Sequence, residues 1–274
     1  MLASRFASRS PSLRSDSPLS DEQIRSVAPS IFAEAAHESR SARYTYIPTI
    51  EVLAGLRREG FEPFMVCQTR VRHEHKREHT KHMIRLRHAD QITGSEANEI
   101  ILLNSHDGTS SYQMLAGMFR FVCCNGMVCG ETAGDIRVRH NGDVVGEVIE
   151  GAFQVLESFE QADTQREAMQ ALTVNPGEQA AFARAALALK YDQEHGAAPV
   201  TESQVLMPRR FEDRRDDLWT TFNRLQENLV KGGLEGRSRN GRATRTRPVN
   251  GIDQNVKLNR SLWVLAEEMR RLKA

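Results

Sequence analysis

Several features that would assign a protein to a membrane, nucleotide-binding or metal class are missing from this sequence. No stretch of about 18 apolar residues occurs, and the most apolar region is interrupted by Arg120 and Asn125, so we expect no transmembrane helix. The glycine patterns GxGxxG and GxxxxGKS/T are absent, which removes the usual sequence support for a nucleotide-binding fold. We therefore expect a soluble, cytoplasmic protein with no membrane partner and no cofactor.

Cysteine and aromatic residues are also scarce. The four cysteines form no CxxC pair, and their spacings match no common zinc pattern. We expect reduced, buried thiols, as in other cytosolic proteins. Aromatic residues make up 6% of the chain, which leaves few rings on which nucleic-acid bases could stack. The cysteines are Cys67, Cys123, Cys124 and Cys129.

Net charge is nearly absent, because 37 Lys and Arg residues are offset by 36 Asp and Glu residues. This balance excludes a strongly basic, coat-like nucleic-acid protein and an acidic solvating tail. The charges are nevertheless segregated along the chain. Residues 70–88 carry seven Lys or Arg against two Glu, residues 231–247 carry six against one, and residues 143–167 carry seven acids against one arginine. Two basic blocks and one acidic block are therefore the main charged features.

The hydrophobic pattern predicts an α+β fold for these 274 residues. A helix is expected at Thr49–Arg58, before a glycine at which it ends. From residue 61 to 139 the period changes to two, which predicts strands at 65–71, 82–87, 99–103 and 112–124. The dipeptide Asn125–Gly126 is the strongest two-residue hairpin turn in the chain. We expect a central antiparallel β-meander.

The C-terminal half of the sequence has helical periodicity. Helices are expected from residue 144 to 159, from 177 to 191, from 213 to 230 and around 258–272. The expected organisation is an N-terminal arm, residues 1–40, with a short helix after Ser20; a β-rich domain, residues 41–142; and a helical region, residues 143–274. A basic loop, residues 234–248, interrupts the helical region.

The first basic block can be interpreted in three ways. His73, His75, His79 and His82 could supply metal ligands, but a zinc site needs three or four ligands that converge on one point, which a hairpin tip does not impose. A solvated basic hairpin is the simplest interpretation. A nucleic-acid contact is the third interpretation. It needs only positive side chains that can reach the phosphates, and no precise ligand geometry. The candidate contact residues are Arg70, Arg72, Lys76, Arg77, Lys81, Arg85 and Arg87.

The second basic block is a loop rich in glycine and arginine. The planar guanidinium group suits phosphate oxygens, whereas charged surface loops are also often merely solvated. We take the loop as the second candidate nucleic-acid contact. Its residues are Arg237, Arg239, Arg242, Arg245 and Arg247.

A polar loop separates two apolar strands near the middle of the chain. Consecutive Ser105, His106 and Asp107 cannot form a catalytic triad, because neighbouring side chains point in alternating directions. The loop could bind a phosphate with its hydroxyls and backbone amides, or it could satisfy its own backbone as a turn, which is the simpler interpretation. The candidate phosphate-loop residues are Asn104, Ser105, His106, Asp107 and Thr109.

Several segments resemble one family over essentially the whole chain. It is the family of prophage- and plasmid-encoded YfjQ/YafZ/YubP-like proteins, domain-of-unknown-function family 932. The resemblance implies a bacterial mobile element, which excludes a mitochondrial role for the Arg- and Ser-rich N-terminus, and it carries no established activity. His73, His75 and His79 depart from the family pattern, whereas His82 and His106 lie inside matching segments. These segments are Leu2–Phe6, Ala28–Phe32, Arg43–Thr49, Cys67–Arg72, Thr80–Met83, Glu99–Met114, Cys123–Gly130, Arg224–Leu234 and Val256–Trp263.

We therefore expect a non-enzymatic nucleic-acid-binding protein of a mobile element, with single-stranded DNA as the favoured partner. Tyr44, Tyr46 or Tyr112 could supply stacking rings. The alternative is a protein–protein effector that antagonises a host defence or DNA-binding protein through the acidic helix face of Glu147, Glu150, Glu157 and Glu160. A homo-oligomer is compatible with either function. No catalytic or metal residue is assigned.

Overall fold

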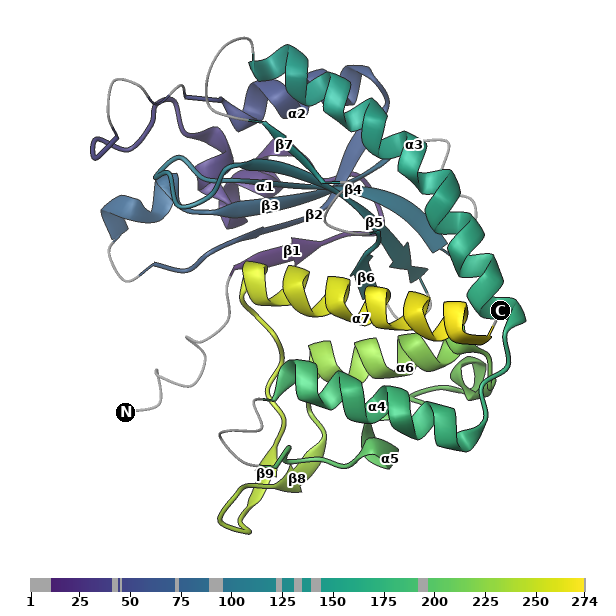
Figure 1. Cartoon of the computed structure of the whole chain (residues 1–274). Coiled ribbons are helices and arrows are strands. Elements are labelled where there is room, and N and C mark those ends of the chain that lie inside the picture. The colour runs from purple at the N-terminus through teal and green to yellow at the C-terminus, as the bar shows by residue number, and fades with distance from the viewer. Residues whose placement is uncertain are drawn as a thin grey trace. The chain divides into compact units, whose positions relative to one another are not determined.

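The computed structural model describes residues 11–40, 44, 46–71, 74–88, 96–121, 125–130, 135–138, 144–191 and 197–273. The chain divides into two units, Met1–Phe159 and Glu160–Ala274, with the boundary inside one long helix. An antiparallel sheet dominates the first unit and helices dominate the second (Figure 1). The expected α+β class is confirmed.

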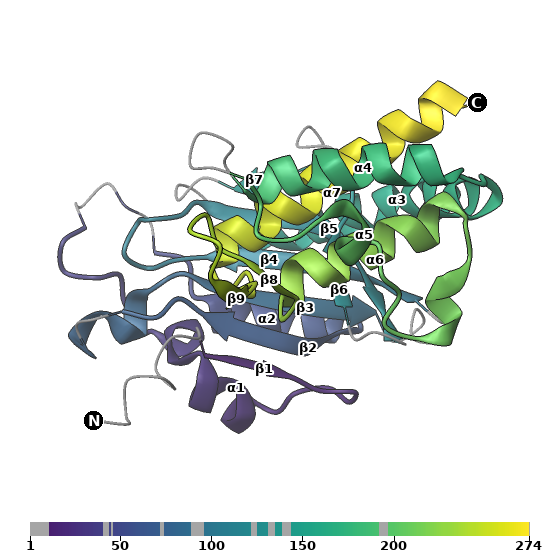
Figure 2. The same cartoon turned by 90° about the horizontal axis from the view of Figure 1, so that it is seen from below.

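The sheet of the first unit has seven antiparallel strands. Six of them follow the order β1-β2-β3-β4-β5-β6, and β7 also pairs with β5. The meander from β2 to β5 can be followed strand by strand in Figure 2. The N-terminal arm joins this sheet, because β1 pairs with the middle of β2. The strands are β1 (Ser12–Arg14), β2 (Phe61–Gln68), β3 (His82–His88), β4 (Glu96–Asn104), β5 (Tyr112–Arg120), β6 (Asn125–Val128) and β7 (Ile136–Val138).

Two helices of the first unit approach each other and the sheet closely, and glycines permit the approach. A Cβ atom at Gly55 in α2 would lie 2.8 Å from Cδ1 of Ile149 in α3, and one at Gly151 would lie 2.4 Å from Cε of Met114. The helical elements are α1 (Asp21–Val27), η1 (Pro29–Phe32), α2 (Thr49–Arg58), η2 (Glu74–His79) and α3 (Val144–Ala171). The predicted bounds of α2 and the Ser20 cap of α1 are confirmed.

The predicted Asn125–Gly126 hairpin turn is wrong. Both residues lie inside β6, where they pair with Arg120 and Phe119, so they are not the central residues of a turn. Gly126 has a different role: a Cβ atom there would lie 2.5 Å from the guanidinium carbon of Arg85. A Cβ atom at Gly117 would lie 2.9 Å from the same guanidinium group. Two glycines on neighbouring strands therefore make room for one arginine side chain.

That arginine belongs to a buried ion cluster on the sheet. The Glu99 carboxylate accepts hydrogen bonds from the Nε atoms of Arg85 and Arg87, the latter at 2.9 Å, and all three side chains are at most 3% exposed. Arg85 also donates to the carbonyl oxygen of Met127. The Arg87 guanidinium lies 4.0 Å from the ring centroid of Phe119 and 4.4 Å from that of Phe64. Cation–π contacts thus supplement a single shared carboxylate.

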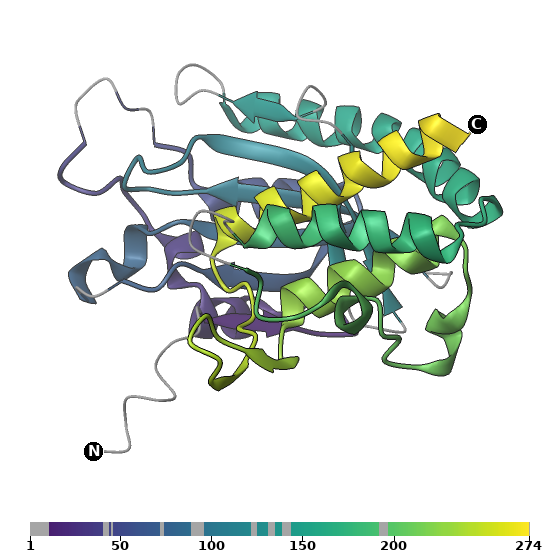
Figure 3. The ribbon, with the colours of Figure 1, turned by 60° about the horizontal axis from the view of Figure 1, so that its bottom comes forward.

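The second unit is built on three helices that lie side by side (Figure 3). Trp219 and Phe222 of α6 stack with ring centroids 5.5 Å apart, and Trp263 of α7 meets Phe222 edge-on at 5.9 Å. None of the described helices is long and apolar enough to cross a membrane. The elements are α4 (Pro176–Lys190), α5 (Glu202–Val205), η7 (Phe211–Arg214), α6 (Leu218–Lys231), β8 (Glu235–Arg237), β9 (Ala243–Arg245) and α7 (Ile252–Lys273).

The ion cluster gives a test of the sheet. Glu99→Gln should lower the free energy of unfolding by about 3 kcal/mol or more, because it leaves two buried guanidinium groups without a counter-charge. Glu268→Gln is the matched control, since its partner Arg271 lies 2.6 Å away and both side chains are half exposed. It should cost less than about 1 kcal/mol. Urea titration measures both values, and equal losses would contradict the assigned role of Glu99.

Candidate nucleic-acid interface

The predicted basic loop, residues 234–248, is a β-hairpin rather than an irregular loop. Strands β8 and β9 pair antiparallel, with Glu235 opposite Arg245 and Arg237 opposite Ala243. At the tip, the amide of Ser238 donates to the carbonyl of Arg242, and Gly241 adopts a φ of +71° that favours glycine. The hairpin projects from the helices of its unit in Figure 1. Each strand has only three residues, too few to show a clear period-two pattern in the sequence, so this segment was predicted to be a loop.

The base of the hairpin is held by backbone contacts on both sides. The amides of Gly233 and Leu234 donate to the carbonyl oxygen and the hydroxyl of Thr246, both within 3.0 Å. The Arg209 side chain donates to the carbonyl of Gly232, and Lys190 donates to the carbonyl of Arg247. Burial lowers the pKa of Lys190 to about 8, so its ammonium group is still charged at neutral pH. The hairpin is therefore fixed where it leaves the core.

The guanidinium groups of the hairpin and its exit face solvent. All five candidate arginines of this block are exposed residues. The accompanying acid, Glu235, lies 3.2 Å from Arg245, but both side chains are more than 70% exposed, so the pair neutralises little of the local field. The structure thus brings the second predicted set together on one small ribbon: Arg237, Arg239, Arg242, Arg245 and Arg247.

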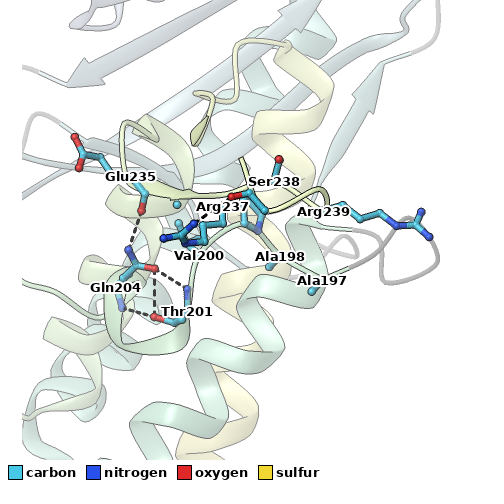
Figure 4. Close-up of a pocket in the computed structure, with 12 residues that line it drawn as sticks. Ala197, Ala198, Val200, Thr201, Gln204, Glu235, Arg237, Ser238 and Arg239 are labelled. Atoms are coloured by element: carbon cyan, nitrogen blue, oxygen red, sulfur yellow. Dashed lines mark hydrogen bonds between the residues drawn. The ribbon is translucent and has the colours of Figure 1, made fainter. Parts of the chain in front are cut away.

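A groove of about 750 Å³ runs beside the hairpin (Figure 4). One side is residues 197–201, and the other is residues 235–241. The two sides meet where the amide of Arg237 donates to the carbonyl of Pro199 at 2.9 Å. The Gln204 side chain donates to the carbonyl of Glu235, which ties α5 to the same strand. Sequence reasoning missed this groove, because residues 197–201 carry no charge or motif.

The first basic block is only partly at the surface. Arg70, Lys76 and Arg77 are exposed, and Lys81 is half-buried. The placement of Arg85 and Arg87 on an exposed contact surface is wrong, since both are buried against Glu99. The alternating pattern of β3 predicted that the face with Arg85 and Arg87 meets solvent. In the structure this face contains the buried ion cluster. Arg72 and His73, and the side chain of His75, lie outside the described residues.

The predicted phosphate loop does not present its residues together to solvent. Asn104, Ser105 and His106 are buried. Asp107 accepts hydrogen bonds from the amide and hydroxyl of Thr109, at 3.0 and 2.6 Å. The Ser105 hydroxyl likewise accepts from the amide of Ser110 at 2.9 Å. The loop therefore satisfies its own backbone, and it is not an open anion site.

The buried side of this loop belongs to a polar cluster that sequence reasoning did not assemble. Six polar side chains, each at most 1% exposed, form a continuous hydrogen-bonded chain. They come from η1, the first turn of α2, the end of β2, the start of β3, the end of β4 and the loop after β4. Their spacing in sequence is wide, so no local motif could have revealed the cluster. The members are Ser30, Thr49, Gln68, His82, Asn104 and His106.

The direction of each hydrogen bond in this polar cluster can be deduced from one end. The Gln68 amide nitrogen donates to the carbonyl of Arg77 at 2.6 Å, so its Oε1 atom is the acceptor facing Ser30. The Ser30 hydroxyl donates to that oxygen at 2.8 Å, and it must then accept from Nδ1 of His82 at 2.9 Å. Nδ1 of His82 therefore carries the proton.

The same logic continues through Thr49. Burial holds the pKa of His82 well below its usual value, so the ring is neutral and its Nε2 accepts from the Thr49 hydroxyl at 3.0 Å. The Thr49 oxygen accepts from the Asn104 amide at 3.0 Å, which leaves its other lone pair for Nε2–H of His106 at 3.4 Å. All hydrogen bonds of the cluster therefore point the same way, from Asn104 and His106 toward the carbonyl of Arg77. The members are buried, so the cluster presents no nucleophile to solvent.

The remaining predicted residues divide between buried and half-buried positions. Tyr112 is fully buried, so its use as a stacking ring is wrong. The hydroxyls of half-buried Tyr44 and Tyr46 donate to the carbonyls of Ser105 and Ala33. Within the described part of the chain, no group of three or more His, Cys, Asp or Glu side chains could hold a metal.

The structure describes two of the four cysteines. Cys67 and Cys129 are buried free thiols, and burial raises the pKa of Cys67 to about 12, so its thiol stays protonated. Cys123 and Cys124 lie outside the described residues.

Acid should destabilise the first unit through His82. Its pKa is depressed in the folded state, so the unfolded chain binds more protons below pH about 6.5, and stability is lost as the pH falls through that value. From pH about 6.5 to 5.5 the loss should reach about 1 kcal/mol. In urea titrations His82→Gln should lose less stability over this range than the parent. An unchanged pH dependence in His82→Gln would refute this assignment.

Comparison with known proteins gives a consistent family assignment. The chain is 60% identical over 268 residues to UPF0380 protein YfjQ of Escherichia coli strain K12, and 59% identical over 268 residues to UPF0380 protein YafZ of the same strain. Each alignment covers 98% of this chain and 97% of the relative. No solved structure matches the fold. The model of the family described as "Domain of unknown function (DUF932)" matches residues 36–263. The chain therefore belongs to the DUF932 family.

Proposed function

We propose that this chain is a non-enzymatic nucleic-acid-binding protein of a bacterial mobile element, that it acts in the cytoplasm, and that single-stranded DNA is its preferred partner. The observation that carries the proposal is the β8–β9 hairpin, with five exposed arginines on and just after a two-stranded ribbon. Its one acid, Glu235, is itself exposed. Phosphate binding is the chemistry that this arrangement serves best.

The hairpin suits contacts to the sugar–phosphate backbone rather than base-specific recognition. Guanidinium groups bind phosphate oxygens with two parallel hydrogen bonds, and such contacts carry no sequence information. The fixed base of the hairpin, held through Gly232, Gly233 and Thr246, limits the conformational entropy lost on binding.

The exposed cations of the first unit remain a second proposed contact. Arg70, Lys76 and Arg77 keep their place in this proposal, with half-buried Lys81 beside β3. Arg85 and Arg87 no longer belong to it, because both side chains are buried against Glu99.

Neutralising the hairpin tests this function. Arg239, Arg242 and Arg247 make no side-chain hydrogen bond within the described residues, so a triple Arg→Gln variant should fold normally. Affinity for a labelled single-stranded oligonucleotide, followed by fluorescence anisotropy, should fall about tenfold or more at low salt. The slope of log affinity against log salt should decrease by about 2, from about 0.7 per lost phosphate contact.

The matched control removes the same charge elsewhere in the second unit. Arg184, Arg215 and Arg271 are each more than half exposed and lie on or beside other helical elements. Replacing these three with Gln should leave affinity and salt slope close to those of the parent. Equal effects of the two triple variants, or no binding at low salt by the parent, would overturn the proposal.

A second function has one supporting observation. Glu147, Glu150, Glu157 and Glu160 are all exposed, and their spacing places them on one side of α3. Such a row of carboxylates could imitate phosphates toward a host defence or DNA-binding protein. Affinity capture from host lysate with nuclease present should then retain a partner that a four-site Glu→Gln variant loses. Loss of every partner on nuclease treatment would leave nucleic-acid binding as the only function supported.

A further inference from the structure

We propose that the groove beside the β8–β9 hairpin holds one unpaired nucleotide of a bound single strand, with the base against residues 197–201 and its phosphate toward the hairpin arginines. The proposal rests on the nucleic-acid-binding function and names the form of nucleic acid that this site selects. Its volume, about 750 Å³, lies within the range of about 300–1,000 Å³ that is usual for small-molecule sites.

The two sides of the groove differ in chemistry. Residues 197–201 contribute the apolar side chains of Ala197, Ala198, Pro199 and Val200. The hairpin side contributes two arginines and one acid, together with a serine and two glycines: Glu235, Gly236, Arg237, Ser238, Arg239 and Gly241. A nucleotide has the same division, with a flat and largely apolar base at one end and a phosphate at the other. In a duplex the base is stacked and paired, so only an unpaired nucleotide could place its base here.

The groove is preformed rather than made by a flexible loop. A Cβ atom at Gly236 would lie 2.1 Å from the carbonyl oxygen of Pro199, so the two sides touch at this point. Thr201 caps the short helix α5 by accepting from the amide of Gln204, and the Gln204 side chain reaches back to β8. The dashed lines in Figure 4 mark the hydrogen bonds of Gln204 with Thr201 and with Glu235. A preformed site loses little conformational entropy on binding.

The charges around the groove favour an anion at one end. The guanidinium of Arg237 is steadied by a hydrogen bond of 3.1 Å to the carbonyl of Gly241, and Arg239 extends outward beyond the hairpin (Figure 4). The Glu235 carboxylate lies 3.2 Å from Arg245 on the neighbouring strand, and it is the one acid of the lining against two arginines. The two cations that line the groove, Arg237 and Arg239, both belong to the hairpin, where the proposal places the phosphate. No aromatic side chain lines the groove, so the base is held by aliphatic contact rather than by stacking.

Filling the groove without changing its charge tests this inference. Ala198→Trp should weaken binding to a single-stranded oligonucleotide about tenfold, which corresponds to about 1.4 kcal/mol. It should leave unchanged the affinity for a duplex of the same length. It should also leave unchanged the affinity for a single strand of abasic sugar–phosphate units, because that strand has no base to lose. Fluorescence anisotropy at one fixed salt concentration measures all three probes.

Two further variants keep the result interpretable. Ala197→Trp places the same ring at a more exposed position of the groove, and it serves if Ala198→Trp disturbs folding. Leu189→Trp adds a ring to α4 outside the groove lining, where Leu189 is 47% exposed, and should bind like the parent. Parent-like binding of both groove variants, or equal weakening on abasic and base-bearing strands, would overturn the inference.

The two proposals fail in different ways. If the triple hairpin variant loses affinity while the groove variants do not, nucleic-acid binding stands and the nucleotide site is refuted. If the parent protein binds none of the three probes at low salt, the proposed function itself is refuted, and the nucleotide site with it.

Discussion

One buried carboxylate, that of Glu99, decides how the sheet of the first unit can be built. It holds Arg85 and Arg87 in the interior, and the space for Arg85 comes from Gly117 and Gly126 on the two strands beyond β4. Removing the carboxylate would leave two cations without compensation, and enlarging either glycine would displace Arg85. Because the two arginines are buried, the positive charge of the first basic block is smaller at the surface than along the sequence. The β8–β9 hairpin is consequently the better candidate for the proposed nucleic-acid contact, because its arginines are exposed.

The sequence was sufficient for those elements whose signals are local. Helix α2 has apolar residues at helical spacing and a glycine after its end, so its bounds were predicted correctly. The Asn125–Gly126 turn failed because the glycine is required by a side chain from β3, some forty residues earlier, rather than by backbone conformation. Likewise, Arg85 and Arg87 resemble surface residues until Glu99 is placed beside them. Alternation alone cannot show whether a polar face meets water or a counter-charge.

At the candidate site, too, the sequence revealed only part of what the structure shows. The arginines between residues 237 and 247 were recognised from composition, and the structure adds that they share one anchored ribbon. The neighbouring groove could not be found, because its other side is a short apolar segment without any motif. Its proximity to the hairpin comes from the Arg237–Pro199 hydrogen bond and the absence of a side chain at Gly236. The charge pattern of the sequence was therefore enough to find the arginines, whereas the groove beside them could be found only in the folded structure.

The polar cluster of the first unit determines proton positions at long range. A main-chain carbonyl, that of Arg77, can only accept, and this fixes the orientation of the Gln68 amide, the Ser30 hydroxyl, the tautomer of His82 and the Thr49 hydroxyl in turn. The order cannot be reversed at one member without being reversed at all of them. A residue that replaces one of these members must therefore donate a hydrogen bond to the member before it and accept one from the member after it. A side chain of similar size that cannot do both would not fit. The direction of donation throughout the cluster is thus set by one peptide carbonyl in η2, and it determines the orientation of a hydroxyl in the first turn of α2.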